Sequence, residues 1–205
     1  LGTAFNNEVR KVVIQTDGKI LVGGTFTDFN GNAIKNLVRL NSDGTEDTGF
    51  STKISSGFNG AVDAIAVQSD GKILVGGEFT TFKGNTRNYL VRLNSDGSDD
   101  TTFYGNLGTA FNSFVYDIEV QSNGQILVGG DFTTFSGNPK NYLIRFNSDG
   151  TEDIAFYGIL GNGFDKPIHT IKEQCDNKIL VGGEFTNLDG NGRKDLLRLN
   201  SDGTE

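Results

Sequence analysis

The sequence predicts an all-β fold built from four tandem repeats, and two observations predict it. First, the Gly-Gly pair of the string DGKILVGG and its variants recurs every 53 residues, at positions 23–24, 76–77, 129–130 and 182–183. Second, other residues recur with the same 53-residue spacing, for example Arg39, Arg92, Arg145 and Arg198. A fixed period of this length is typical of repeat proteins, in which each repeat buries its apolar face against its neighbours. We expect one array over residues 1–205, with repeats at about 1–53, 54–106, 107–159 and 160–205.

The second repeat illustrates the first two predicted strands. Residues 62–68 are rich in β-branched side chains and predict a strand. Residues 69–71 (Ser-Asp-Gly) follow it and predict a tight turn, because Asp and Gly tolerate the positive φ that such a turn needs. Residues 72–79 predict a second strand, buried on both faces because its apolar residues are consecutive. The paired glycines in this strand indicate either the close approach of another backbone or a bulge.

The rest of the repeat completes the predicted blade. Residues 81–87 predict a polar loop around a Gly-Asn turn, and residues 89–93 predict a third strand. We expect a fourth strand between Asp99 and Phe111, with Phe103 and Phe111 as buried anchors. Three or four antiparallel strands in about 50 residues are typical of a β-propeller blade. The Asp-Gly hairpin turns favour this architecture over a β-solenoid, and the four in-phase blades would form either a ring or an arc of a larger propeller.

Composition excludes several classes of partner. The formal charge is −8 and no basic block occurs, so we expect no nucleic-acid binding. The longest apolar runs have the length of strands, so we expect no membrane insertion. Cys175 is the only cysteine, which excludes a disulfide within the chain. The chain begins at Leu1, has no methionine and stops inside a repeat, so we expect it to be part of a larger chain or assembly.

The repeat string resembles a known family. V-x-x-I-x-V-Q-S-D-G-K-I-L-V-G-G, followed by L-V-R-L-N-S-D-G-S-D-D-T-T-F, is similar to the delta-sixty type of β-propeller repeat over essentially the whole chain. The fourth copy departs from it at Glu173 and at Asp176-Asn177. The resemblance implies a β-propeller and a place in large bacterial surface proteins or phage particles, but it implies no shared chemistry. We therefore expect an extracellular, cell-surface or virion location.

Oxygen-bearing side chains at the turns raise the question of calcium. Asn41, Asp43 and Asp47 lie close together in sequence and recur in later repeats. Calcium needs six to eight oxygen ligands, and capping of the turn by Asp and Asn explains the same residues, so we expect no metal site and no cofactor. The strand arginines such as Arg39 need a carboxylate once they are buried, and an Asp of a neighbouring turn is the expected partner.

The residues for catalysis are sparse. His169 and Cys175 occur once each, six residues apart, without an evident orienting acid. Paired carboxylates are abundant, but they repeat in every copy, as structural residues do. We expect no catalytic residues and no enzymatic activity, with a carbohydrate-active enzyme as the least favoured alternative.

One loop combines a constant frame with variable positions. The frame Phe-x-Gly-Asn hardly changes, whereas the next two positions vary, the second being Ile34, Arg87, Lys140 and Arg193. A repeat binding surface has this pattern, and so do exposed loops under neutral drift. The candidate ligand contacts are the loop residues and the tyrosines that follow them: Asn85, Arg87, Tyr89, Asn138, Lys140, Tyr142 and Arg193.

The function predicted from these patterns is binding. We expect a non-enzymatic adhesion module that recognises a glycan or a protein on a cell surface, with weak single contacts adding through multivalency. The alternative is a purely structural spacer or assembly module of a larger surface protein or of a phage tail.

Overall fold

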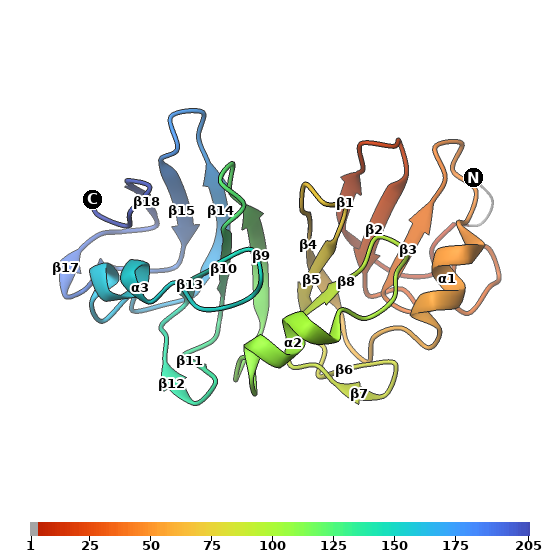
Figure 1. Cartoon of the computed structure of the whole chain (residues 1–205), viewed down its shortest axis with the longest axis horizontal. Coiled ribbons are helices and arrows are strands. Elements are labelled where there is room, and N and C mark those ends of the chain that lie inside the picture. Colours follow the sequence, from red (N-terminus) through yellow and green to blue (C-terminus); the bar gives the residue numbers. More distant parts are fainter. Residues whose placement is uncertain (1–3) are drawn as a thin grey trace. The chain divides into compact units, whose positions relative to one another are not determined.

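The computed structural model describes residues 4–205, and the chain divides into two compact units, Leu1–Asp100 and Thr101–Glu205. Each unit contains two three-stranded antiparallel sheets (Figure 1). In each sheet the second strand of the repeat lies in the middle, between the first and the third. This order is the hairpin order that the Asp-Gly turns predict.

The first unit contains the first two sheets together with a helix and a short hairpin. Its elements are β1 (Val9–Ile14), β2 (Ile20–Gly24), β3 (Leu37–Leu40), α1 (Thr48–Ile54), β4 (Val62–Val67), β5 (Ile73–Gly77), β6 (Thr81–Phe82), β7 (Asn85–Thr86) and β8 (Leu90–Leu93). The first sheet is β1-β2-β3, the second is β4-β5-β8, and β6 pairs with β7.

The second unit repeats this plan and begins with a helix. Its elements are α2 (Thr101–Leu107), β9 (Val115–Val120), β10 (Ile126–Gly130), β11 (Thr134–Phe135), β12 (Asn138–Pro139), β13 (Leu143–Phe146), α3 (Ile154–Leu160), β14 (Ile168–Glu173), β15 (Ile179–Gly183), β16 (Asn187–Leu188), β17 (Asn191–Gly192) and β18 (Leu196–Leu199). The third sheet is β9-β10-β13 and the fourth is β14-β15-β18.

The predicted fourth strand is wrong, because a two-turn helix lies there. Between Asp99 and Phe111 the chain forms α2, and α1 and α3 occupy the same place in their repeats. In α1 the carboxylate of Asp47 caps the helix by accepting a hydrogen bond from the Phe50 N–H at 3.2 Å. Phe50 and Ile54 lie one turn apart, so both reach the core from one face. A run with one such pair has too few apolar positions to register as a periodic helix.

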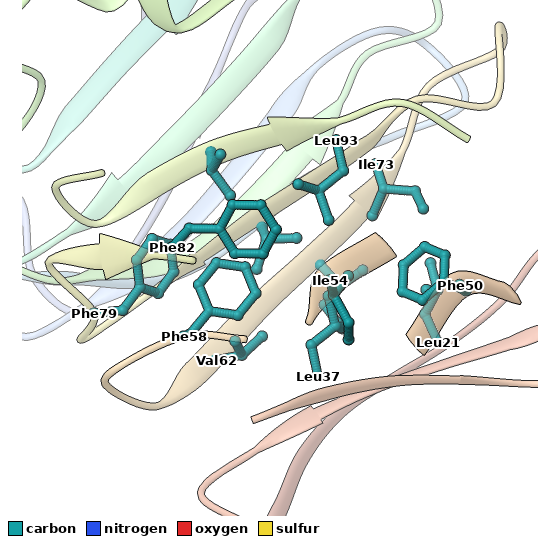
Figure 2. Packing of buried hydrophobic residues seen from close by; sticks show 13 residues of the cluster. Leu21, Leu37, Phe50, Ile54, Phe58, Val62, Ile73, Phe79, Phe82 and Leu93 are labelled. Carbon is teal, nitrogen blue, oxygen red and sulfur yellow. The ribbon is translucent and has the colours of Figure 1, made fainter. Parts of the chain in front are cut away.

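Within each unit one helix, α1 or α3, packs between the two sheets of that unit. In the first unit Phe50 and Ile54 of α1 belong to one buried cluster with Leu37 of the first sheet and Ile73 and Leu93 of the second (Figure 2). The same cluster contains three rings in close contact: Phe58 lies 4.5 Å from Phe79 and 4.8 Å from Phe82, between ring centroids. An equivalent cluster fills the second unit. Phe103 and Phe111 are buried, as the sequence predicts.

The two glycines of the first Gly-Gly pair have different roles. A Cβ on Gly24 would lie 2.0 Å from the carbonyl oxygen of Glu8, where a bulge shifts the register between β1 and β2. A Cβ on Gly23 would instead lie 2.5 Å from Cγ1 of Val62 in the next sheet. The second glycine therefore accommodates the bulge within a sheet, and the first allows close packing between sheets. The two alternatives inferred from the sequence, a bulge and the close approach of another backbone, therefore both hold at Gly24, whereas Gly23 faces a side chain of the next sheet.

The strand arginines pair with the carboxylates that begin the helices. The distance from Nε to Oδ2 is 2.9 Å for Arg39–Asp47, 3.0 Å for Arg92–Asp100 and 2.9 Å for Arg145–Asp153. Burial alone would raise the pKa of Asp47, but hydrogen bonds from Lys19, the Phe50 N–H and Arg39 lower it to about 2. The predicted structural pairing is thus confirmed in three repeats. Arg198 of the fourth repeat is exposed.

Candidate functional site

The predicted loop residues lie on and after the short hairpins. Asn85 and Asn138 are exposed on β7 and β12. Tyr89 and Tyr142 follow the hairpins with φ of 67° and 69°, a left-handed conformation that is rare for bulky residues. Both tyrosines are partly buried. Their backbone N–H groups donate to carbonyl oxygens of the preceding segment, which fixes the chain as it enters the third strand.

The three predicted cations each pair with an acid twelve residues later. The ion pairs are Arg87–Asp99 (Nη2 to Oδ2, 2.5 Å), Lys140–Glu152 (Nζ to Oε1, 2.6 Å) and Arg193–Glu205 (Nε to Oε2, 2.6 Å). Arg87 and Lys140 are buried, whereas Arg193 is exposed. The seven candidates therefore belong to three hairpins in two units, and their contact with a ligand stays a prediction.

A second set of variable residues lies at the bulges of the first strands. In each sheet one residue of the first strand lacks a register partner, and these residues are Arg10, Asp63, Tyr116 and His169. The glycines that impose the bulge do not change, whereas the bulged residue differs in every repeat. Bulges re-aim a side chain and often occur beside functional sites. Alignment of the repeats by their 53-residue step exposes this variation, but the ligand contacts predicted from the sequence lie in the loops and the tyrosines that follow them, and do not include it.

In the first unit the bulged residues form a charged cluster. Nη1 of Arg10 lies 2.7 Å from Oδ1 of Asp63 and 2.8 Å from Oε1 of Glu78. Burial raises the pKa of the Asp63 carboxyl, and its hydrogen bond with Arg10 opposes this effect. These contacts join the first strands of two successive sheets.

In the second unit the bulged residues form an aromatic pair. The ring of Tyr116 stacks on that of His169 with centroids 5.1 Å apart and an angle of 26°. Phe114 extends this surface, with its centroid 6.4 Å from that of Tyr116. Nε2 of His169 lies 2.9 Å from Oε1 of Glu184, which follows the glycine pair of the fourth sheet. We call Phe114, Tyr116, His169 and Glu184 the aromatic patch.

The strands β9 and β14 hold this patch in place. Oδ2 of the buried Asp117 accepts a hydrogen bond from the Ile171 N–H at 2.9 Å. Further along the same strands, Nζ of Lys172 lies 2.7 Å from Oε1 of Glu119. These bonds fix the two strands side by side, so the rings of Tyr116 and His169 are held at a defined spacing.

Asp43, Cys175 and His169 are the remaining residues whose types suggest metal binding or catalysis. Oδ1 of Asp43 accepts hydrogen bonds from the N–H and the hydroxyl of Thr45 at 2.9 and 2.6 Å, which is the capping role expected for this turn. Within residues 4–205 no group of three or more His, Cys, Asp and Glu side chains is arranged to hold a metal ion. Cys175 is exposed, and His169 contacts Glu184 and Tyr116. None of the helices described here is long and apolar enough to cross a membrane.

Four in-phase sheets of antiparallel strands, with the same turns, glycine pairs and bulges, define a β-propeller repeat protein. The chain belongs to the family described as domain of unknown function (DUF5122) beta-propeller, whose model matches residues 15–50, 68–103, 121–156 and 174–204. The matches confirm the predicted β-propeller repeats, although the family description does not carry the delta-sixty name.

Solved structures with a similar chain path come from Bacteroides. The extracellular domain of a putative hybrid two-component system from B. thetaiotaomicron has 16% identity and a TM-score of 0.48, over 94% of this chain and 23% of that one. A protein of unknown function from Bacteroides caccae has 12% identity and a TM-score of 0.35, over 96% of this chain and 79% of that one. This chain thus spans about a quarter of the length of the first of them. No curated protein matches the sequence significantly.

Proposed function

We propose that this chain is a non-enzymatic binding module, displayed outside the cell or on a virion, that recognises a glycan through the aromatic patch. The observation that carries the proposal is the stack of Tyr116 on His169 at the bulges of two adjacent strands. A pyranose ring has an apolar face of C–H groups, and flat aromatic surfaces bind such faces while leaving the hydroxyl groups in solvent.

Polar groups beside the rings supply the hydrogen bonds that such a ligand needs. The Glu184 carboxylate is exposed at the edge of the patch and accepts hydrogen bonds from hydroxyl groups. Oδ2 of Asp131 lies 3.1 Å from Oγ of Ser113, next to Phe114, and offers a second acceptor. A few polar groups around an apolar surface are the usual composition of a ligand site.

The position of the patch on a repeated scaffold supports an adhesion role. The frame of strands and glycines is constant, whereas the bulged side chain changes between Arg10, Asp63, Tyr116 and His169. A single shallow patch binds weakly, but several copies displayed together gain avidity without any new contact. This is how we expect the module to hold a polysaccharide or a glycosylated surface.

The test is a glycan array followed by titration of the best binder. Tyr116→Ala is expected to lower affinity about fivefold, since an aromatic stack of this kind contributes about 1 kcal/mol. Asn138→Ala, a change in the exposed loop β11–β12, is the matched control and is expected to leave affinity unchanged. If Asn138→Ala lost binding while Tyr116→Ala bound fully, the glycan would bind at the loops and not at the aromatic patch.

An assembly role is the second candidate, because one sheet face is bare. Leu196 on β18 is 65% exposed, whereas its counterparts Leu37 and Leu143 are fully buried against the sheet that follows each of them. A face of this kind suits packing against another blade. A silent glycan array would favour this reading, and hydrolysis of a polysaccharide by the chain would overturn both non-enzymatic proposals.

A further inference from the structure

The first repeat lacks an ion pair that the other three repeats contain. In those repeats the residue after the short hairpin is a cation that pairs with an acid twelve residues later: Arg87–Asp99, Lys140–Glu152 and Arg193–Glu205. In the third repeat the cation also lies over a ring, with Nζ of Lys140 3.7 Å from the centroid of Tyr157. Three repeats thus place a cation against a carboxylate, and in the second and third repeats that carboxylate lies just before a helix.

The first repeat departs from this plan at two positions. Ile34 replaces the cation, and Ser51 replaces the tyrosine that stands at 104 and 157 in the next two repeats. The acid is retained as Glu46, and its Oε2 accepts a hydrogen bond from Nδ2 of Asn32 at 3.1 Å. Within the described residues, 4–205, Glu46 forms no ion pair with a lysine or arginine. The first repeat therefore keeps the carboxylate but has lost both the cation and the ring.

A pocket occupies the space that the smaller side chains leave. It has a volume of about 260 Å³, and its lining includes Ile34, Glu46, Ser51 and Ile54. Oγ of Ser51 is buried and has no hydrogen-bond partner. A buried hydroxyl without a partner costs free energy, and a ligand that donates a hydrogen bond to it removes this cost. The wall is therefore apolar at the two isoleucines and offers acceptors at Glu46 and Ser51.

We propose that this pocket binds an organic monocation, a primary ammonium or a guanidinium on a short aliphatic stem. The charged head would pair with Glu46 and donate to Ser51, and the stem would lie against Ile34 and Ile54, so the ligand would take the place that Lys140 fills in the third repeat. The volume is below that of ordinary ligand pockets and suits a group the size of one side chain. Calcium fits poorly, since it requires six or more oxygen ligands. The site is independent of the aromatic patch, which lies in the other unit.

The experiment titrates the intact chain with n-butylammonium and n-propylguanidinium, followed by calorimetry and by NMR. 1-Butanol is the neutral control and is expected to bind at least tenfold more weakly. Glu46→Gln keeps the shape of the acid without its charge and is expected to lower affinity for both cations at least tenfold. Ile34→Arg combined with Ser51→Tyr rebuilds the ion pair of the other repeats, and we expect it to abolish binding.

The reciprocal variant tests the comparison between repeats. Lys140→Ile combined with Tyr157→Ser removes the internal cation and ring around Glu152, and it is expected to create a second cation site per chain. The bound cation could belong to a protein side chain or to a small molecule. Comparison of a blocked tripeptide that has a central lysine with butylammonium distinguishes these two sources. Equal affinity indicates a protein side chain as the ligand, and binding of the free amine alone indicates a small molecule. Equal binding of 1-butanol and butylammonium, or unchanged affinity in Glu46→Gln, would overturn the proposal.

Discussion

Replacing Arg145 by leucine tests whether the strand arginines stabilise the sheets. Arg145 is 6% exposed, and its Nε and Nη2 both lie 2.9 Å from Oδ2 of Asp153. Its guanidinium lies 4.0 Å from the ring centroid of Phe156, and Nη1 donates to the carbonyl oxygen of Ser201 in the turn after β18. Leucine would leave the Asp153 carboxylate without its cation, a change that costs about 3–5 kcal/mol for a buried pair.

We expect a value near the lower end of that range, about 3 kcal/mol, because other donors to the carboxylate remain. Nε2 of Gln125 lies 2.8 Å from Oδ2 of Asp153, and the Phe156 N–H lies 3.3 Å from Oδ1. For a chain of this size, 3 kcal/mol corresponds to a fall in Tm of about 6–12 °C. Circular-dichroism melts and urea unfolding measure both quantities.

Arg198 provides the matched control, since it has the same register in the fourth sheet but is exposed. Arg198→Leu is expected to change stability by no more than about 0.5 kcal/mol, as for most surface substitutions. Equal losses in Arg145→Leu and Arg198→Leu would refute the argument that the buried pair carries the effect. Stability that is unchanged in both variants would refute it as well.

Two further predictions concern packing and acid stability. Gly129→Ala places a Cβ 2.8 Å from Cγ2 of Ile168 in the next sheet and is expected to lower the free energy of unfolding by about 2 kcal/mol through overpacking. The Cβ of the control, Gly182→Ala, comes close only to Cγ2 of Thr170, so we expect less than half of that loss when both are measured by urea unfolding. Equal losses in the two variants would contradict the close contact between sheets. Because the folded pKa of Asp47 is about 2, below its unfolded value of about 3.9, its stabilising contribution is fully present above about pH 4 and is lost as the pH falls toward 2. Asp47→Asn should therefore flatten the pH dependence of the free energy of unfolding in this window, and a slope parallel to that of the natural chain would contradict the assignment.

The strands were predictable because their signals are local. Residues 62–68, 72–79 and 89–93 were predicted, and β4, β5 and β8 occupy 62–67, 73–77 and 90–93. The turn glycine and the apolar run lie within a few residues of each other, so no distant contact is needed to place them. The helices were missed because a two-turn helix contributes only one apolar pair, such as Phe50 and Ile54. The aspartate three residues before Phe50 is the capping signal that would have found α1.

The site was less predictable because it depends on which repeats touch. Comparison of the copies reveals that Tyr116 and His169 occupy equivalent positions, but only the packing of β9 against β14 brings their rings together. The loop cations present the opposite case. Arg87 is variable and polar, which suggests a ligand contact, yet in the structure its guanidinium is buried against Asp99. Variation between repeats therefore does not by itself identify a ligand contact, because a variable side chain that is buried can instead pair with another residue of the chain.

The position of α1 between two sheets determines where the chain can be divided. The cluster that contains Phe50 and Ile54 runs from Leu21 to Leu93 and so exceeds one 53-residue period. An excised fragment that begins or ends next to the helix would separate these side chains from one of the two sheets that they contact. Grafting or shuffling of repeats should therefore place its junctions in the exposed turns between the first and second strands, such as residues 69–71, and each exchanged segment should carry the helix together with the glycine pair that precedes it.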